Sequence, residues 1–167
     1  MSLKAHSGGM TLIELMITIF VLAILAMIGV PSFQNASLGS RLAAAANNLL
    51  ASVQLARSEA IKRNAAVTLC ASSDGATCAG SGGWEQGWII VDAAAAVIQS
   101  HEGLSFGYRI TQTGGTSALS FQSIGIGATA ATFTVCRDDP IGGQERVLSV
   151  SAAGAAYVTT TTTGTCL

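Results

Sequence analysis

Charged side chains are scarce in this sequence. Asp, Glu, Lys and Arg together make up 10% of its 167 residues, and eight basic residues face nine acidic ones, which gives a formal net charge of −1. Tight binding to nucleic acid depends on a surplus of Lys and Arg that neutralises phosphates. The absence of such a surplus argues against nucleic-acid binding as the main activity.

Residues that could carry out catalysis or hold a metal are equally few. His6 and His101 are the only histidines, and no two cysteines have the Cys-x-x-Cys spacing that is typical of a zinc site. We interpret His101, in the polar segment 100–103, as a solvated residue of a turn. The glycine-rich segment 80–83 lacks the lysine and the helix that follow a phosphate-binding loop. We therefore expect no enzymatic activity, no cofactor and no metal.

One long apolar run lies near the amino terminus. Between Met10 and Val30 the only polar residues are Thr11, Glu14 and Thr18. As a helix with a rise of about 1.5 Å per residue, this run spans roughly 30 Å, the thickness of the hydrocarbon core of a bilayer. The run is therefore predicted to cross a membrane.

The segment before this run carries a single lysine, Lys4. By the positive-inside rule that end stays cytoplasmic, and the rest of the chain faces the periplasm or the exterior. A secretory signal peptide fits poorly, because the run is too long and no small-residue cleavage pattern closes it. An ordinary anchor explains the length but not Glu14, whose charge costs about 2.5–3.5 kcal/mol at the bilayer centre and less near the interface. We infer that Glu14 has a partner.

Helical periodicity continues beyond the apolar run. Pro31 removes a helical hydrogen bond, so we expect the long helix to be kinked or interrupted there. Arg41, Gln54 and Arg57 fall off the apolar stripe that follows. This pattern predicts an amphipathic helix whose apolar face packs on a sheet. The apolar positions recur at steps of three and four residues: Leu42, Ala46, Leu49, Val53, Ala56 and Ala60.

After Asn64 the period changes to two, as in β-strands. Gly-rich turns between the segments favour antiparallel pairing, so the expected fold class is α+β. We interpret residues 93–96, 74–75 and 138–140 as turns, the last two in preference to cation sites. Trp88 is assigned to the core, whereas Trp84 fits either the core or a ligand platform. The predicted strand segments are 67–70, 88–91, 106–110, 119–121, 132–136, 146–150 and 155–160.

The four cysteines, Cys70, Cys78, Cys136 and Cys166, all lie on the predicted exterior side. An even number of cysteines in an oxidising compartment indicates disulfides, and three pairings are possible. We favour Cys70 with Cys78, which closes a short loop, and Cys136 with Cys166, which ties down the carboxyl-terminal tail.

The segment Gly9-Met10-Thr11-Leu12-Ile13-Glu14-Leu15 resembles the processing motif of type IV pilins and pseudopilins. The resemblance implies that prepilin peptidase cuts between Gly9 and Met10, and that the new amino terminus on Met10 is N-methylated. Met10 stands where the family usually has Phe. In a filament, Glu14 of one subunit neutralises the Met10 amine of its neighbour, and we expect both residues on one face of the helix. Glu14 and Pro31 are thus assigned to assembly.

Later segments resemble the GspH/FimT group of minor pilins. Residues 54–63 followed by 67–70 are similar to the junction between helix and first strand in that group. Trp84, Gly87-Trp88 and Asp92 resemble its next segment, and 133–138 with 146–154 resemble its final strands. The resemblance implies a pilin-like α+β fold, with a long amino-terminal helix, apolar then amphipathic, packed on antiparallel sheets. The implied boundaries are a leader at 1–9, a transmembrane and filament-core helix at 10–30, an amphipathic helix at 31–64 and a β-rich domain at 65–167.

The implied function is that of a FimU/FimT-like minor pilin, in the complex that initiates or caps a type IV pilus. Its partners are then prepilin peptidase, other minor and major pilins, and the inner membrane. The chain crosses that membrane once with a periplasmic carboxyl-terminal domain, and then enters the pilus or pseudopilus. A GspH-like minor pseudopilin of type II secretion is one alternative, and a DNA-binding competence pilin is another. DNA-binding members share a Gly-Arg-x-Arg stretch where this chain has Gly154-Ala155-Ala156-Tyr157, so DNA is not an expected partner.

Overall fold

The computed structural model describes residues 10–81, 83–126, 130–137 and 145–161, and the side chains of residues 30–35 are not included. The chain forms two compact units, Met1–Leu38 and Gly39–Leu167. A single helix, α1 (Leu12–Arg63), contributes its first part to one unit and its second part to the other.

We expected Pro31 to kink or interrupt the helix, and the interruption is wrong, because α1 runs through this position as one element. Proline removes one N–H donor from the helical ladder, and inside a helix it can kink the helix without ending it. The hydrogen bonds of the turns on either side are sufficient to keep the helix continuous. Gly39 likewise lies inside α1.

The carboxyl-terminal end of α1 is closed by a residue in the left-handed conformation. Asn64 has φ 48°, and its N–H donates to the carbonyl of Ile61 at 3.2 Å. The N–H of Ala65 donates to the carbonyl of Ala60 at 3.2 Å. This pair of bonds is a Schellman motif, in which asparagine tolerates the positive φ better than most residues. The motif turns the chain from α1 into the first strand.

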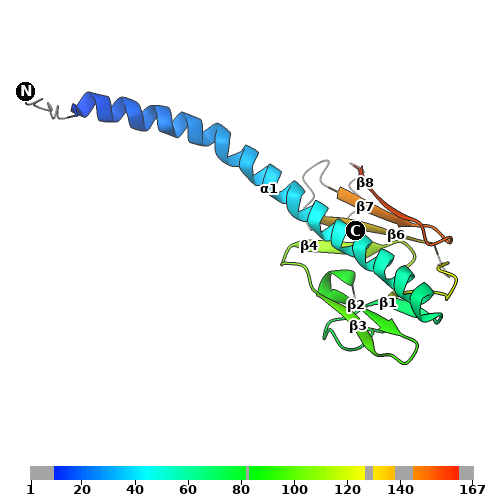
Figure 1. The fold of residues 1–167 in the computed structure, drawn as a ribbon. Coiled ribbons are helices and arrows are strands. Elements are labelled where there is room, and N and C mark those ends of the chain that lie inside the picture. Colours follow the sequence, from blue (N-terminus) through cyan, green and yellow to red (C-terminus); the bar gives the residue numbers. More distant parts are fainter. Residues whose placement is uncertain (1–9, 82, 127–129, 138–144, 162–167) are drawn as a thin grey trace, which may run out of the picture. The chain divides into compact units, whose positions relative to one another are not determined.

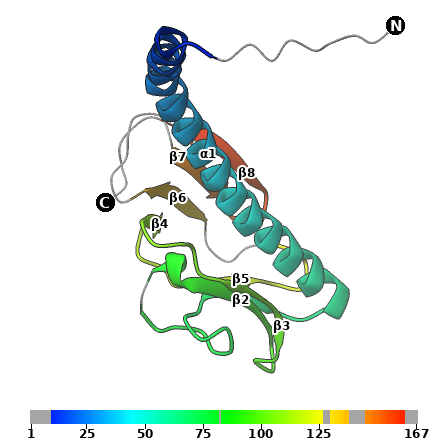
Figure 2. The same cartoon turned by 90° about the vertical axis from the view of Figure 1, so that its left-hand side faces the viewer.

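The second unit contains two four-stranded antiparallel sheets, and Figures 1 and 2 show the part of α1 that belongs to this unit lying along both. In the first sheet the order is β3-β2-β1-β5, and in the second it is β4-β6-β7-β8. A short 3-10 helix, η1 (Trp84–Gln86), precedes β2. The strands of the first sheet are β1 (Val67–Ala71), β2 (Gly87–Asp92), β3 (Val97–Glu102) and β5 (Ala118–Phe121). Those of the second are β4 (Tyr108–Gln112), β6 (Ala131–Arg137), β7 (Glu145–Val150) and β8 (Ala156–Thr161).

The apolar stripe of α1 forms one side of the core. The six residues predicted from its periodicity are all fully buried, which confirms the amphipathic helix. Trp88 is 1% exposed and belongs to the core as predicted. Trp84, for which the sequence left the core and a ligand platform open, is 2% exposed and also belongs to the core. The ring of Trp84 meets Phe133 of β6 edge to face, with centroids 4.9 Å apart. This contact joins η1 to the second sheet.

Two strand predictions need correction. His101 does not lie in a turn, because it belongs to β3, a strand at the edge of the first sheet that the sequence pattern missed. An edge strand exposed on both faces shows no apolar alternation, so the sequence of β3 did not indicate a strand that pairs with β2. The strand predicted at 106–110 begins at Tyr108 instead, because Gly107, with φ 87°, places residues 106–107 in a turn. The predicted turn at 93–96 is confirmed.

Candidate functional site

The amino-terminal part of α1 carries most of the large exposed apolar side chains among the described residues. Its large apolar side chains between Leu12 and Ile28 are 46–79% exposed. Among the described residues one helix is long and apolar enough to cross a membrane, and the segment that meets this test is Leu12–Gly29. At 1.5 Å per residue its 18 residues span about 27 Å. Apolar surface of this extent requires lipid or other helices to cover it.

Glu14 takes part in a capping box at the start of this segment. The carboxylate Oε2 of Glu14 accepts hydrogen bonds from the backbone N–H of Thr11 at 3.4 Å and from its hydroxyl at 3.3 Å. In return the N–H of Glu14 donates to Thr11 Oγ1 at 3.3 Å. The motif satisfies N–H groups that the first turn of a helix leaves without partners, and it places a negative charge where the helix dipole favours one. The spacing Thr-x-x-Glu before an apolar run was a signal for it that our sequence reasoning missed.

Thr11 therefore defines where the helix begins. Its carbonyl accepts the first helical hydrogen bond, from Leu15 N at 3.1 Å, and α1 starts at Leu12. Met10 lies outside the helix, one residue before the cap. The expectation that Met10 and Glu14 share a helix face is wrong in this structure, because α1 begins at Leu12, after Met10 and before Glu14. Gly9 lies outside the described residues.

The third polar residue of the apolar segment is satisfied within the helix. The hydroxyl of Thr18 donates to the carbonyl of Leu15 at 2.8 Å. A hydroxyl bonded to the backbone of its own helix costs little in lipid, whereas one without a partner costs several kcal/mol, on the order of 2–7. The segment therefore presents one ionisable group, Glu14, next to its amino-terminal end.

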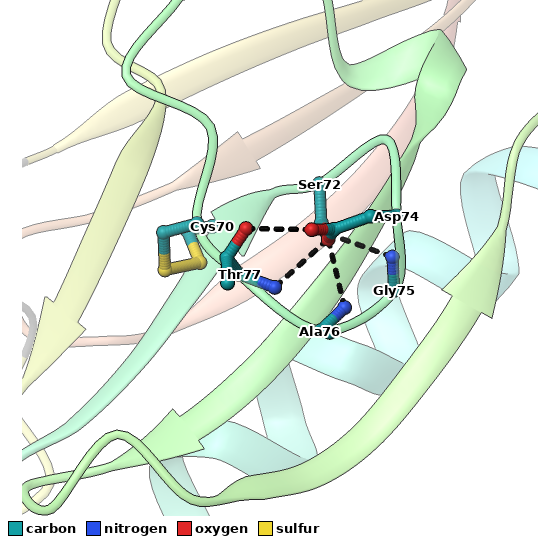
Figure 3. The surroundings of a disulfide bond; sticks show 7 residues. Cys70, Ser72, Asp74, Gly75, Ala76 and Thr77 are labelled. Atoms are coloured by element: carbon teal, nitrogen blue, oxygen red, sulfur yellow. Dashed lines mark hydrogen bonds between the residues drawn. A yellow bond between two sulfur atoms is a disulfide. The ribbon is translucent and has the colours of Figure 1, made fainter.

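The first predicted disulfide is present in the second unit. Cys70 at the end of β1 is bonded to Cys78, with Cα atoms 5.5 Å apart and a separation of eight residues (Figure 3). Cys136 is also disulfide-bonded. Its predicted partner Cys166 lies outside the described residues, so that pairing stays a prediction.

Asp74 organises the loop that this disulfide closes. Its carboxylate accepts bonds from the N–H of Thr77 at 2.8 Å, the N–H of Ala76 at 2.9 Å, the hydroxyl of Thr77 at 2.7 Å and the hydroxyl of Ser72 at 3.0 Å (Figure 3). These bonds, led by the one from the Thr77 backbone, hold the pKa of Asp74 well below its usual range. The predicted turn at 74–75 is confirmed, and its carboxylate is occupied by donors of the loop itself. The predicted turn at 138–140 lies outside the described residues.

Several basic side chains have structural partners. Arg57 donates from Nε to the carbonyl of Gly125 at 2.8 Å and from Nη1 to that of Gly154 at 3.2 Å. Arg63 pairs with Glu59 at 2.7 Å and with Asp92 at 3.2 Å. Hydrogen bonds from Arg63 and Lys62 lower the pKa of Glu59. These contacts fasten the end of α1 to the loops around it. Within the described part of the chain, no group of three or more His, Cys, Asp or Glu residues could hold a metal ion.

The exposed apolar helix with its capping glutamate, followed by a two-sheet domain, defines a protein of the pilin type, and comparison with known proteins agrees. Residues 4–30 match the model of the prokaryotic N-terminal methylation motif. Residues 45–154 match the model of the Type II transport protein GspH. Because this second match covers more than half of the chain, the chain belongs to the GspH family. A comparison with curated protein sequences gave no match.

Solved structures of minor pilins and pseudopilins are similar to this chain. One is the type IV minor pilin FimU of Pseudomonas aeruginosa PAO1, with 29% identity over 72% of this chain and 89% of that one and a TM-score of 0.60. A second crystal form of FimU is 31% identical, covers 71% of this chain and 92% of the FimU chain, and has a TM-score of 0.58. The minor pseudopilin EpsH of the Vibrio cholerae type 2 secretion system is 14% identical and covers 72% of this chain and 97% of the EpsH chain. Its TM-score of 0.51 shows a shared fold. The expected pilin-like α+β fold is confirmed.

Proposed function

We propose that this chain is a minor pilin of a type IV pilus, acting in the complex that initiates or caps the fibre. The observation that carries the proposal is the similarity to FimU, at 31% identity over 92% of the FimU chain. The pseudopilin EpsH shares the fold, but its identity of 14% is too low to support membership of the same kind of secretion system. The bare apolar segment Leu12–Gly29 supplies the surface that such a subunit needs, first for the membrane and then for other helices.

Processing removes residues 1–9 by a cut between Gly9 and Met10, made by prepilin peptidase. The match of residues 4–30 to the methylation motif supports this step. The position of Met10 before the helix supports it as well, because a peptidase needs a scissile segment that is not held in helical hydrogen bonds. The cut exposes an ammonium group on Met10, which is then methylated.

Glu14 serves assembly in this proposal. Both bonds that Thr11 donates to the carboxylate reach the same oxygen, Oε2. A carboxylate has about four acceptor positions, so the capping box leaves capacity for a further cation. The Met10 ammonium of an adjacent subunit fills this capacity, and the pair removes the cost of a lone anion among packed apolar helices. Pro31 follows the apolar segment, where the chain passes from filament core to domain.

Before assembly the subunit resides in the inner membrane, with residues 12–29 across the bilayer and the two-sheet domain in the periplasm. The Cys70–Cys78 disulfide supports this location, because disulfides persist in the oxidising periplasm. Other minor pilins and the major pilin are its partners in the fibre.

Membership of a type II secretion system is the second candidate, since the matching family model is described as a type II transport protein. Deletion of the gene in its host separates the two systems. The pilus proposal predicts loss of twitching motility and of surface pili with normal exoprotein secretion, and recovery when the gene is restored. Loss of secretion with intact motility would assign the chain to the pseudopilus instead.

The third candidate, a competence pilin that binds DNA, is tested by a gel shift over a salt series. The stretch that corresponds to the Gly-Arg-x-Arg of DNA-binding members contains no arginine here, and begins at Gly154, whose carbonyl accepts from Arg57. We expect no shift even at low salt, where phosphate contacts are strongest.

A further inference from the structure

The second sheet ends in a strand, β8, which pairs with β7 on one side and with no other strand among the described residues (Figure 1). Its register with β7 runs without a shift from Glu145↔Thr161 to Val150↔Ala156. In an antiparallel pair, every second residue directs its N–H and C=O away from the neighbouring strand. The outer edge of β8 is therefore a row of backbone donors and acceptors that another strand can pair with.

Two hydrogen bonds fix which residues of β8 face outward. In the turn before β8, the N–H of Ser151 donates to the carbonyl of the opposed residue Ala155 at 2.8 Å, so these two form a hydrogen-bonded pair. At the other side of the sheet the N–H of Thr113 donates to the carbonyl of Thr132 at 2.9 Å, and alternation across β6 and β7 gives the same assignment. The backbone groups that bond to β7 belong to residues 157, 159 and 161, and those that point outward belong to residues 156, 158 and 160.

This edge lacks the features that usually keep sheet edges from pairing. Those features are charged side chains, proline, bulges and short length. The six residues of β8, AYVTTT, include no charge and no proline, and no bulge interrupts its pairing. Each of the other edge strands in the described part of the chain has such a feature. The strand β3 carries Glu102 and pairs with β2 through a register shift, β4 carries Arg109, and β5 has only four residues.

The edge is also held in place before a partner arrives. The turn that leads into β8 is closed by the N–H of Gly154, which donates to the carbonyl of Ser151 at 2.8 Å. Arg57 of α1 donates to the carbonyl of Gly154 at 3.2 Å and to that of Gly125 at 2.8 Å. A strand that is already ordered loses less conformational entropy when another strand pairs with it.

The geometry and charge of the sheet indicate the kind of partner. Each strand is antiparallel to its neighbour, so β4 at one edge and β8 at the other run in opposite directions. A subunit of the same fold that lies beside this one in the same orientation therefore presents to β8 a strand antiparallel to it. A second copy of this chain would bring Arg109 of β4 to an edge strand that contains no carboxylate. The fit favours a different subunit whose edge strand is uncharged.

We propose that β8 receives an uncharged edge strand of a neighbouring, different pilin subunit, which joins the four-stranded sheet as an antiparallel strand. The proposal rests on the proposed function, in which this chain acts next to other pilins. The outward backbone groups of Ala156, Val158 and Thr160 supply the hydrogen bonds, and main-chain bonds give the affinity in strand addition of this kind. The exposed side chains of Tyr157 and Thr159 lie on the sheet face opposite to that of Val158 and contact the side chains of the added strand.

Proline substitutions test the outward groups one at a time, because proline has no N–H to donate. In the purified full chain, Thr160→Pro removes an outward N–H and should leave the thermal midpoint of unfolding unchanged. Thr159→Pro removes an N–H that bonds to β7 and should lower the midpoint. Thr160→Ala keeps the N–H and is the control for loss of the side chain. An equal fall of the midpoint in both proline variants overturns the assignment of the edge and the proposal with it.

The same variants are then expressed in the host strain from which the gene has been deleted, and immunoblots of sheared pili measure incorporation. We expect Thr160→Pro to reach the inner membrane at the native level and to enter pili about tenfold less, the effect of roughly one lost hydrogen bond. Ala156→Pro repeats the test at the other end of the edge and should give the same result. Thr160→Ala should enter pili as the native chain does.

Photo-cross-linking identifies the strand that pairs with β8. Benzoylphenylalanine in place of Tyr157, an aromatic residue that is 58% exposed, should join the chain in pili to an edge strand of another pilin, mapped by mass spectrometry of the cross-linked peptides. The same group in place of Phe106, which is 103% exposed and lies outside β8, should not reach that strand.

Normal incorporation of Thr160→Pro overturns the strand addition and leaves the proposed function intact. Unchanged pili and motility in the deletion strain overturn both. A cross-link from position 157 to a second copy of this chain or to a helix of another subunit overturns the proposal, and so does the absence of any cross-link from that position.

Discussion

The indole Nε1 of Trp88 donates a 2.8 Å hydrogen bond to the hydroxyl of Ser52, in the interior between β2 and α1. Ser52 is 3% exposed and itself donates to the carbonyl of Asn48 at 3.0 Å. On the other side, the Trp88 ring stacks on His101 of β3, with centroids 4.1 Å apart and planes 8° from parallel. Trp88 thus connects the edge strand, the centre of the sheet and the helix.

Removal of the Ser52 hydroxyl should destabilise the domain. Ser52→Ala leaves a buried indole N–H without its acceptor, and we expect a loss of about 1–3 kcal/mol in the free energy of unfolding. Ser58→Ala is the matched control, because Ser58 is an exposed residue of the same helix that bonds only to the carbonyl of Leu55. Denaturant unfolding of the full chain in detergent micelles measures both. Equal stability of the two variants would show that the bond between Trp88 and Ser52 contributes nothing.

The disulfide between Cys70 and Cys78 should stabilise the fold mainly by restricting the unfolded chain. For a separation of eight residues, loop entropy predicts that joint replacement of both cysteines by alanine lowers the free energy of unfolding by about 2.5 kcal/mol. Substitution is preferable to a reductant, because Cys136 is disulfide-bonded as well. The thermal midpoint of the double variant gives the answer, and an unchanged midpoint would contradict the prediction.

Asp74 should make the stability of the disulfide loop depend on acid. Its pKa is depressed in the folded protein from the ordinary value of 3.8, so ionised Asp74 favours folding at pH values above 3.8. This contribution is lost as pH falls below 3.8 toward the depressed pKa, where the folded protein takes up the proton. Asp74→Asn should therefore be less stable than the native chain at neutral pH, and the gap should close as acid is added. Unfolding of both proteins over one pH series at constant ionic strength tests this, and a gap that does not change with pH would refute it.

Glu14 should be needed for assembly but not for cleavage. Glu14→Ala removes the charge and the capping box together, so we expect normal leader removal and impaired incorporation into fibres. Glu14→Gln separates the two roles, because glutamine can still accept from Thr11 in a capping box but carries no charge. We expect Glu14→Gln to be as defective as Glu14→Ala in immunoblots of sheared pili. Normal incorporation of Glu14→Gln would show that the cap matters and the charge does not.

Gly9 should determine where the leader is cut. A bulky side chain before the scissile bond blocks the peptidase, so Gly9→Val should keep residues 1–9 attached. Gly8→Ala leaves Gly9 in place and serves as the control. The intact mass of the membrane-extracted protein reports the cut site, the methyl group and the four lost thiol protons together. A mature-size product from Gly9→Val would contradict the prediction.

Local patterns predicted the helix and most strands. The stripe from Leu42 to Ala60 repeats with the period of an α-helix, and alternation marked segments such as 132–136, because side-chain burial follows backbone geometry over a few residues. Two features escaped this reasoning. The strand β3 pairs with β2 but has no apolar alternation of its own, and the cap at Thr11 is marked by the Thr-x-x-Glu spacing and not by the apolar pattern.

The sequence by itself determined the membrane-length apolar segment with its lone carboxylate, the amphipathic stripe and the residues of the processing motif, because each is a property of neighbours along the chain. Only the tertiary structure decided that Trp84 is buried, that His101 stacks on Trp88 and that Phe106 stands free in solvent. These outcomes depend on which strands pair and which loops meet the helix. Contacts between residues far apart in the chain arise from the packing of whole elements, which no short stretch of sequence encodes.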